Sequence, residues 1–479
     1  MTIFNVSSDA EIVTALSNAV GGDTISVATG SYGQVTVSGQ GYSGSYVTLT
    51  SADGNRGAEI AAMSITTSSY FAVDGVKVIG SGQTGGHKIY MNDVDFIKIN
   101  DCEIAGTIDS NLTDFRGIYG DNNGGLRDII ISNNDIHHCN GGIWLYQTDG
   151  LLLSNNDVNY TGDDALKFST LNDYIIELNR FYDIVRDGTK HTDFMQFENS
   201  NGTSNGIIRK NVQLLSGPSN FVYAPSTYAG AQGIFHNAGP ATNVTIEDNI
   251  IYTAHINAIK VNSASTNCTI QRNSVIHAPT ALYSTTHKYS SIQGGNTLLG
   301  NLSSTATGSQ VGLSAAGLVM STTDAGSQYY QSDMITNPDA GYGVTLEDLL
   351  PIVGTAAEFL GADTYLKSLT GSVGSAPTAG GNLASQSFGE YSGSYTYATA
   401  FDFTGADIVY SINSVSGVTI DSATGVITFD TNVMAVQAGT AITVTATNAT
   451  SPAATSTFDL SIAEWVSSGM KIKASVVFA

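Results

Sequence analysis

Charged residues and proline are both scarce in this chain of 479 residues. Asp, Glu, Lys and Arg together make up only 12% of the sequence, and Pro occurs 8 times. Gly, Ser, Thr, Asn, Val and Ile are abundant instead. Because β-branched residues favour strands, and glycine and asparagine favour tight turns, this composition predicts β-structure with many turns rather than a bundle of helices.

Basic residues are the rarer of the charges. The sequence contains 18 Lys and Arg against 41 Asp and Glu, which gives a net charge of −23. A nucleic-acid backbone or an anionic membrane surface would be repelled by this charge unless a local basic patch overrode it, and the sequence has no such patch. We therefore expect no nucleic-acid partner.

Cysteines are few, and their spacing does not fit a metal site. Cys102, Cys139 and Cys268 lie far apart in the sequence and cannot all pair with one another. Cys268 aligns with Val244 of a neighbouring repeat, which is an apolar position. This alignment predicts a buried thiol rather than a disulfide or a metal ligand.

Long apolar runs are missing as well. No stretch approaches the length needed to span a bilayer, so we expect no membrane insertion. The first residues, Met1 to Val6, lack the basic start and apolar run of a secretory signal. Either an export signal has been removed, or the protein leaves its cell in another way, for example in a particle released by lysis. We expect an extracellular or virion location.

A short repeated phrase is the strongest feature that is present. Its members recur roughly 22 to 24 residues apart where no insertion intervenes, which indicates one supersecondary unit stacked many times. The phrase is centred on Asn134, Asn156, Asn179, Asn249 and Asn273, with Asn100 before the series and Asn211 and Asn301 fitting less well. At a tight bend such an amide can bond to the asparagines of the coils above and below, and asparagine tolerates left-handed backbone.

The first residues resemble a known cap. Residues 9–20 predict a helix with Ile12, Val13, Leu16 and Val20 on one face, and glycines end it. This helix, followed by Gly-Asp-Thr-Ile and a Gly-Ser-Tyr turn, resembles the N-terminal cap of right-handed parallel β-helix proteins, pectate- and alginate-lyase-like ones among them. The resemblance and the repeat together imply an all-β fold built around a right-handed parallel β-helix.

The rest of the chain divides by composition and pattern. A strongly alternating segment near the C-terminus, with a Thr419–Ile427 turn and a Gly439–Thr447 strand, resembles the Ig-like β-sandwich modules of bacterial and phage surface proteins. We predict a cap helix in residues 1–22, the β-helix in 23–302, an irregular cap and linker in 303–381, an Ig-like β-sandwich in 382–465 and a terminal strand or tail in 466–479.

One column of side chains should face outward from the coils. Strands that begin with Gly-Ile-type pairs superpose, and the residue after each inward aliphatic falls in the same column. The column contains Tyr119, Trp144, Lys167, Gln196, Phe235 and Lys260. Tyr119 and Trp144 can stack on sugar rings or pack under a loop, and the sequence favours neither. Gln196, His236 and Lys260 are further candidates for substrate binding.

The residues that the repeat does not require are the best candidates for chemistry. Asp163, Asp164 and Lys167 replace the usual start of a coil, and one coil later the chain brings His191, Asp193 and Glu198. Stacking of neighbouring coils places Asp164 opposite Asp193. In a structural interpretation, the two adjacent aspartates only bond to their own turn and Lys167 pairs with a nearby acid.

Two mechanisms fit this cluster. In a polysaccharide lyase, a cation such as calcium held by Asp163, Asp164 and Asp193 would neutralise a uronic carboxylate, and Lys167 or His191 would remove a proton. In a glycoside hydrolase, two of the carboxylates, Glu198 among them, would act as acid and base. Neither the metal nor the reaction is determined by these residues.

Gly162-Asp163-Asp164 resembles the Gly-Asp-Asp element of pectin-degrading polygalacturonases, in which a histidine follows one coil later as His191 does here. The Asn-Thr-Asp and Arg-Ile-Lys elements of that family are missing, so its activity is not carried over.

An acidic β-helix followed by an Ig-like module, without disulfides, resembles a phage tailspike. This resemblance implies a homotrimer, attached to other virion proteins, that binds and in many cases depolymerises a host cell-surface polysaccharide. A secreted bacterial polysaccharide lyase or hydrolase acting on an acidic glycan is the alternative. A non-enzymatic adhesin or virion structural protein is a second alternative.

Overall fold

The computed structural model of this chain divides into two compact units, Met1–Leu366 and Lys367–Ala479, and each is treated by itself below. It describes residues 1–79, 86–106, 115–121, 124–184, 192–198, 202–214, 231–236, 238–253, 257–262, 264–277, 288–289, 297–299, 302–303, 346, 349, 362–370, 378–379, 385–389, 394–398, 403–404, 408–422, 425–435, 437–447 and 453–463.

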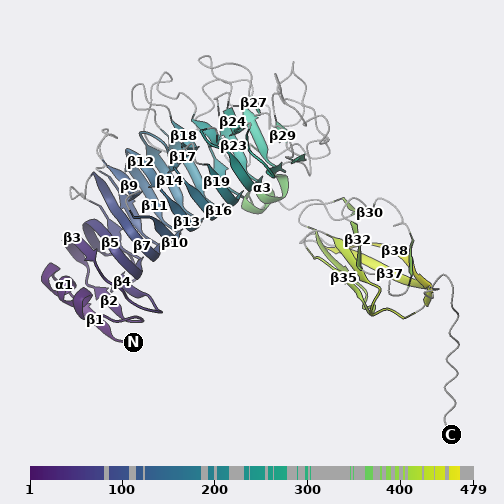
Figure 1. Ribbon diagram of the computed structural model, residues 1–479, viewed down its shortest axis with the longest axis horizontal. Coiled ribbons are helices and arrows are strands. Elements are labelled where there is room, and N and C mark those ends of the chain that lie inside the picture. The colour runs from purple at the N-terminus through teal and green to yellow at the C-terminus, as the bar shows by residue number, and fades with distance from the viewer. Residues whose placement is uncertain are drawn as a thin grey trace, which may run out of the picture. The chain divides into compact units, whose positions relative to one another are not determined.

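The first unit begins with the predicted helix. In the chain, helix α1 (Asp9–Asn18) follows strand β1 (Ile3–Val6) and precedes strand β2 (Thr24–Val27), and Ser8 caps its N-terminus. The helix lies at the N-terminal end of the rod (Figure 1). The apolar face of α1 is narrower than predicted, because Val13 is 60% exposed and only Ile12, Ala15 and Leu16 are buried. The helix ends at Asn18, so Val20 lies outside it and is 65% exposed. The helix therefore covers the first coil with a single stripe of side chains.

Five strands build the first coils, namely β3 (Gly30–Ser38), β4 (Val47–Ser51), β5 (Ala58–Asp74), β6 (Lys77–Val78) and β7 (His87–Asn100). Each pairs in parallel with its successor one coil later, as β5 does with β7. The two longest, β5 and β7, each run across more than one side of the rod, since β5 pairs with both β3 and β4 and β7 with both β9 (Arg116–Gly120) and β10 (Leu126–Ser132). The first strand, β1, pairs in the same way with β2.

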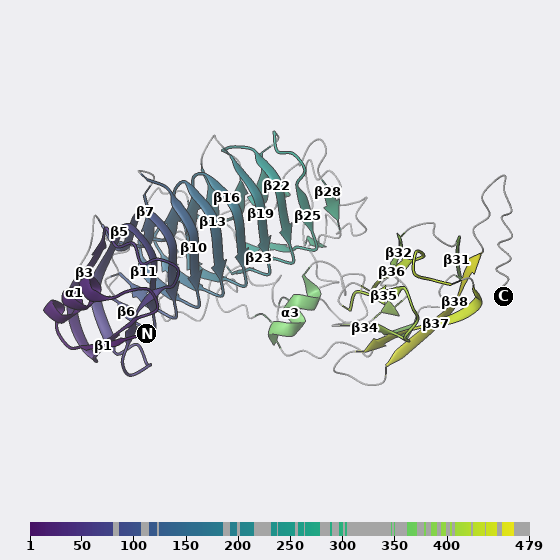
Figure 2. The same ribbon diagram turned by 60° about the horizontal axis from the view of Figure 1, so that its bottom comes forward.

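From β8 onward each coil contributes three strands, one to each side of the rod (Figure 2). Face A contains β9 (Arg116–Gly120), β12 (Gly141–Leu145), β15 (Leu166–Phe168), β18 (Asp193–Phe197), β21 (Gln232–His236), β24 (Asn257–Val261) and β27 (Lys288–Tyr289).

Face B contains β10 (Leu126–Ser132), β13 (Thr148–Ser154), β16 (Leu171–Glu177), β19 (Thr203–Arg209), β22 (Ala241–Glu247), β25 (Thr269–Gln271) and β28 (Thr297–Leu299). Face C contains β8 (Glu103–Ala105), β11 (Asp135–Cys139), β14 (Asp157–Thr161), β17 (Arg180–Ile184), β20 (Val212–Gln213), β23 (Ile250–Thr253), β26 (Ser274–His277) and β29 (Leu302–Ser303). Every pairing between neighbouring coils in these faces is parallel, so the predicted parallel β-helix is confirmed.

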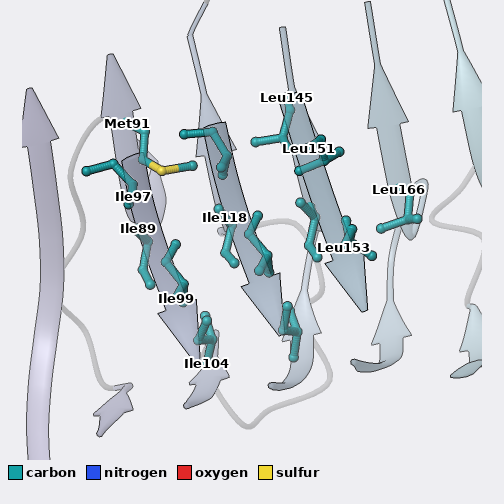
Figure 3. Packing of buried hydrophobic residues seen from close by; sticks show 14 of the residues in the cluster. Ile89, Met91, Ile97, Ile99, Ile104, Ile118, Leu145, Leu151, Leu153 and Leu166 are labelled. Atoms are coloured by element: carbon teal, nitrogen blue, oxygen red, sulfur yellow. The ribbon is translucent and has the colours of Figure 1, made fainter. Parts of the chain in front are cut away.

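Aliphatic side chains fill the interior of the rod in stacked rows (Figure 3). Ile89 and Ile118 lie opposite each other on successive strands of face A, and Ile97 precedes Ile129 in the same way on face B. All four side chains are completely buried. Parallel stacking in register repeats the same environment from coil to coil, which explains why the sequence repeats the same residue types.

A ladder of buried asparagines marks one corner of the coils. Each Oδ1 atom accepts hydrogen bonds from the backbone N–H and the Nδ2 of the preceding member, as Asn179 does from Asn156 at 3.0 and 2.9 Å. The members are Asn134, Asn156, Asn179, Asn211, Asn249 and Asn273. Asn211 is thus a full member, although its sequence fits the repeat less well.

The start of the ladder differs from the prediction. Cys102, not Asn100, stands at the ladder position, and its backbone N–H donates to Asn134 Oδ1 at 2.9 Å. The left-handed residues also lie one position earlier than the ladder, for example Asn133 (φ 59°) and Asn155 (φ 56°). Asn301 lies outside the described residues. The buried amide and the left-handed backbone, which the sequence assigned to one residue, therefore belong to two neighbours.

All three cysteines are buried and free, as predicted. Cys268 is 3% exposed. Burial raises the pKa of the thiols of Cys102 and Cys139 to about 12. These thiols stay protonated and behave as small apolar side chains.

The end of the first unit is only partly described. Helix α3 (Asp363–Thr370) crosses the boundary between the units, and the N–H of Ala362, just before it, donates to Ser274 Oγ of β26 at 2.9 Å. Most of the predicted irregular cap and linker, residues 303–381, falls outside the described residues. None of the helices in the described ranges is long and apolar enough to cross a membrane.

The second unit is built of short strands, most of them antiparallel. Its strands are β30 (Thr378–Ala379), β31 (Gln386–Gly389), β32 (Ser394–Ala398), β33 (Phe403–Thr404), β34 (Val409–Ile412), β35 (Val418–Ile420), β36 (Val426–Asp430), β37 (Gln437–Thr447) and β38 (Ala454–Ala463). One sheet has the order β31-β38-β37-β34 and another the order β32-β36-β35. Phe429 of the second sheet and Phe458 of the first belong to one buried core. A separate C-terminal β-unit is present as expected, and its Ig-like type stays a prediction.

Candidate functional site

The outward column predicted from the sequence exists on face A. In the strand register Tyr119 lies opposite Trp144, Trp144 opposite Lys167 and Lys167 opposite Gln196. The same register continues from Gln196 to Phe235 and from Phe235 to Lys260. We call the column of Tyr119, Trp144, Lys167, Gln196, Phe235 and Lys260 the outward strip.

Two further residues extend or flank the outward strip. Tyr90 precedes Tyr119 in the register, and the two rings stack with their centroids 6.2 Å apart. Tyr146 packs against the Tyr119 ring at 5.7 Å. Tyr146 lies two residues after Trp144, so the alternation of side chains along a strand places it on the same side. This alternation was the available signal for Tyr146, which the sequence analysis missed.

Trp144 is covered although it faces outward. Its side chain is only 5% exposed, and its indole Nε1 donates to the backbone oxygen of Asp164 at 3.2 Å. The Arg116 guanidinium carbon and the Lys167 ammonium lie 4.1 and 4.8 Å from the ring centroid. The face of the Trp144 ring therefore contacts two cations, Arg116 and Lys167. Tyr119 is the more accessible of the two aromatic rings.

Two aspartates are buried where neighbouring coils meet. Asp164 is 1% exposed and Asp193 is completely buried. The Asp193 N–H donates to Asp164 Oδ1 at 2.8 Å. Burial, and next the charges of Asp193 and Asp163, raise the pKa of Asp164 well above its usual range, and the charge of Lys167 only partly opposes this.

Lys167 joins this buried pair to a more exposed carboxylate. Its ammonium lies 2.8 Å from Glu198 Oε2 and 3.6 Å from Asp164 Oδ2. Burial lowers the pKa of Lys167, but the hydrogen bond that its ammonium donates to Glu198 and the charge of Asp164 more than offset this effect, so its pKa is raised. An ammonium held in this way keeps its proton, which argues against the use of Lys167 as a base.

Glu198 is an accessible acidic group of the cluster, with its side chain 32% exposed. Burial, and next the charge and hydrogen bond of Glu198, raise the pKa of Tyr146. Asp163 is half-buried, and its Oδ1 accepts a hydrogen bond from the Asp164 N–H at 3.1 Å. This is the turn contact that the structural interpretation of the two aspartates predicted.

The remaining candidates are placed less favourably. The expectation that His236 faces the outward strip is wrong: its side chain is 1% exposed, stacks on Phe197 at 4.5 Å and contacts Thr203 Oγ1 through Nε2 at 2.6 Å. Because Phe235 occupies the outward position, the next residue must point inward. Lys260 lies 5.2 Å from the Phe235 ring. His191 lies outside the described residues.

The described carboxylates do not fit a calcium ion. In the described ranges no group of three or more His, Cys, Asp or Glu side chains is arranged to hold a metal. Asp164 Oδ1 accepts the Asp193 N–H, and Asp164 Oδ2 faces the Lys167 ammonium, which leaves that carboxylate engaged on both oxygens. We therefore derive no step through a metal at Asp163, Asp164 and Asp193.

Comparison with known proteins agrees with this architecture. A family model described as right handed beta helix region matches residues 60–301, about half of the chain. The match covers faces A, B and C from β5 (Ala58–Asp74) onward, including the whole outward strip. No curated protein matches the chain.

Several solved structures are similar to the chain at low identity. The chain is similar to pectate lyase Pel9A, at 13% identity over 74% of this chain and 90% of that one, with a TM-score of 0.42. It is similar to an alginate lyase from Paenibacillus sp. str. FPU-7, at 16% identity over 63% of this chain and 99% of that one, with a TM-score of 0.37. It is also similar to the PL6 family polysaccharide lyase Pedsa3628 from Pseudopedobacter saltans, at 14% identity over 62% of this chain and 92% of that one, with a TM-score of 0.29. Likeness at this level carries no argument about what this chain does.

Proposed function

The chain belongs to the right-handed beta helix family, and from the geometry of its outward strip we propose that it binds an acidic polysaccharide along face A and cleaves it at Glu198. One observation carries the proposal. The Lys167 ammonium is held between the buried Asp164 and the accessible Glu198, within a row of aromatic side chains. Aromatic rings offer flat apolar surface to sugars, and a fixed ammonium offers positive charge to an anionic one.

The burial of Asp164 favours elimination over hydrolysis. A hydrolase needs two carboxyl groups that reach the glycosidic bond from opposite sides. Asp164 is 1% exposed, and the group that lies 2.8 Å from the accessible Glu198 is the Lys167 ammonium and not a second carboxylate. Elimination needs one base and a cation beside the uronic carboxylate, which Glu198 and Lys167 supply.

The proposed step uses only these groups. Glu198 takes the proton from the carbon next to the uronic carboxylate, and the released electron pair forms a carbon–carbon double bond as the bond to the leaving oxygen breaks. The Lys167 ammonium keeps its own proton and stabilises the charge on the carboxylate, and Glu198 passes the proton that it has taken to the leaving oxygen. Asp164 does not touch the glycan and acts as a positioning residue that holds Lys167.

The test is cleavage of uronate polymers by the full chain. The unsaturated sugar end absorbs in the ultraviolet, so absorbance with polygalacturonate or alginate reports elimination directly. We expect Glu198→Gln to lower the rate by about a hundredfold or more, because it removes the base. Glu177→Gln is the matched control, since Glu177 pairs with Arg209 on face B and is remote from the strip. His191→Ala tests the role that the sequence predicts for that residue.

Other outcomes would correct the proposal. New reducing ends without ultraviolet absorbance would show hydrolysis instead. Loss of cleavage in a chelator, restored by calcium, would show that a cation takes part, as the sequence analysis allowed. Binding without any cleavage would show an adhesin, and equal rates for Glu198→Gln and the parent would show that the catalytic group lies elsewhere.

We also propose that this chemistry serves a phage tailspike, located on the virion and directed at a host cell-surface polysaccharide. The all-β rod followed by a separate β-unit supports this setting. A homotrimer is expected, so light scattering of the purified chain should give three times the mass of one copy. A single copy, together with a gene neighbourhood free of virion proteins, would favour a secreted bacterial enzyme with the same site.

A further inference from the structure

Arg116 differs from the other arginines that the structure describes. Arg56, Arg127, Arg180, Arg209 and Arg272 each form an ion pair with Asp or Glu, at distances between 2.5 and 2.8 Å. Arg116 has no such partner among the described residues, although acidic groups outnumber basic ones 41 to 18 in the chain. In so acidic a protein, an arginine that stays out of an internal ion pair is available to an external anion.

The protein holds this guanidinium in place without neutralising it. It rests on Trp144, with 4.1 Å between Arg116 Cζ and the ring centroid, and 5.2 Å from the ring of Tyr119. Gly141, opposite Arg116 in the strand register, leaves room for the indole, because a Cβ there would lie 2.4 Å from Trp144 Nε1. A side chain at position 141 would displace the Trp144 ring on which the Arg116 guanidinium stacks.

Neighbouring groups keep the charge of Arg116 uncompensated. Nε is buried and makes no hydrogen bond. The His87 ring stacks on Tyr119 with centroids 4.0 Å apart, and burial, and next the charge of Arg116, lower the pKa of His87 to about 4. A neutral His87 adds no competing charge. The arrangement presents a planar, fixed cation without an ion pair among the described residues, which suits binding of a carboxylate or sulfate.

We infer that Arg116 forms an anion subsite that binds the carboxylate or sulfate of an acidic sugar, separate from the Lys167–Glu198 pair. Both cations contact Trp144, from strands of different coils, so a glycan lying along the outward strip meets Arg116 and Lys167 in succession. Lys167 forms ion pairs with Asp164 and Glu198, whereas Arg116 forms none with the described residues. Arg116 therefore selects for acidic polysaccharides before the cleavage step, and this inference rests on the proposed function.

Binding is measured by affinity electrophoresis of the full chain carrying Glu198→Gln, so that the polymers remain uncut. Polygalacturonate, alginate, chondroitin sulfate and dextran are the probes. Adding Arg116→Gln is expected to weaken binding to the acidic polymers by about ten- to a hundredfold and to leave binding to dextran unchanged, because a charge-assisted bidentate contact is lost. Arg116→Lys should restore only part of the affinity. A larger loss on polygalacturonate than on dextran sulfate, a further probe whose anion is sulfate alone, identifies carboxylate as the preferred anion.

Two controls separate this inference from the proposed function. Arg127→Gln, which removes an exposed arginine paired with Asp95 on face B, should leave binding unchanged. Thermal unfolding of each variant shows whether Trp144 and its surroundings stay folded. If the acidic polymers bind but Arg116→Gln binds them as tightly as the parent, or loses dextran equally, the anion subsite is refuted and the proposed function stands. If no acidic polymer binds the parent, both are refuted.

Discussion

The buried asparagine ladder and the outward strip run along the same rod with the same spacing between coils, yet they follow opposite rules. Six successive coils place asparagine in the ladder, because each amide needs an identical amide on both sides to complete its hydrogen bonds. Six successive positions of the strip hold five different residue types. A position that holds the same residue in every coil is therefore required by the fold. A position that varies from coil to coil, as in the outward strip, can carry functional side chains.

The ladder should be the more costly region to break. In Asn179→Ala, Asn156 loses the acceptor of its N–H and Nδ2, while Leu153 O and Asn211 Oδ1 lose a donor, all inside the rod. We expect a loss of about 3–5 kcal/mol in the free energy of unfolding, because buried groups are left without partners. Urea unfolding followed by circular dichroism measures it.

The control for this variant lies on the adjacent corner. Asn155 is exposed and donates to Asn133 Oδ1 at 2.6 Å, and its backbone is left-handed, so Asn155→Gly keeps the backbone unstrained, loses a solvent-accessible bond and should cost only about 1 kcal/mol. Equal losses for the two variants would mean that the ladder contributes no more than an ordinary turn.

His236 tests the boundary between the interior and the strip, since it follows the outward Phe235 but points inward. Burial lowers its pKa to about 4. Protonation then favours the unfolded chain, so this histidine should lower stability as the pH falls from about 6.5 towards 4, by up to about 3 kcal/mol. In His236→Gln the decline of unfolding free energy over this interval should be shallower. Parallel pH curves for parent and variant would show that His236 titrates normally.

The smallest effect is expected on the strip itself. Tyr119→Ala removes a half-buried ring that packs on His87 and Tyr146, and we expect glycan binding about three- to tenfold weaker with the rod intact. Tyr182→Ala, on face C, is the comparison variant and should leave binding unchanged. Equal binding by Tyr119→Ala and the parent would show that the aromatic side chain of Tyr119 does not contribute to glycan binding.

Parallel stacking explains why so much of the fold could be predicted from the sequence. Once a few coils are aligned, the register carries each position to the next coil, so the column from Tyr119 to Lys260 followed from the repeat alone. The same logic would have excluded His236, because alternation fixes its direction once Phe235 is placed outward. Cys102 shows the limit of pattern matching, since it holds a ladder position that the asparagine search assigned to Asn100.

The electrostatics of the site could not be predicted in the same way. From the sequence alone, Lys167 is a candidate base. Its short distances to Glu198 and Asp164 show instead an ammonium held in two ion pairs, which keeps its proton. Arg116 shows no signal in the sequence, because its distinguishing property is a missing ion pair, which depends on contacts between different coils. Such properties arise from distances between side chains and not from spacing along the chain.

The asparagine ladder also governs how the rod can change in length. Each member accepts from the coil before it and donates to the coil after it, so every internal coil presents the same upper and lower polar surface. Removing or duplicating one whole coil joins two compatible surfaces, whereas a change of a few residues within a coil puts the ladder out of step. The coil is therefore the natural unit by which this protein can gain or lose glycan-binding length.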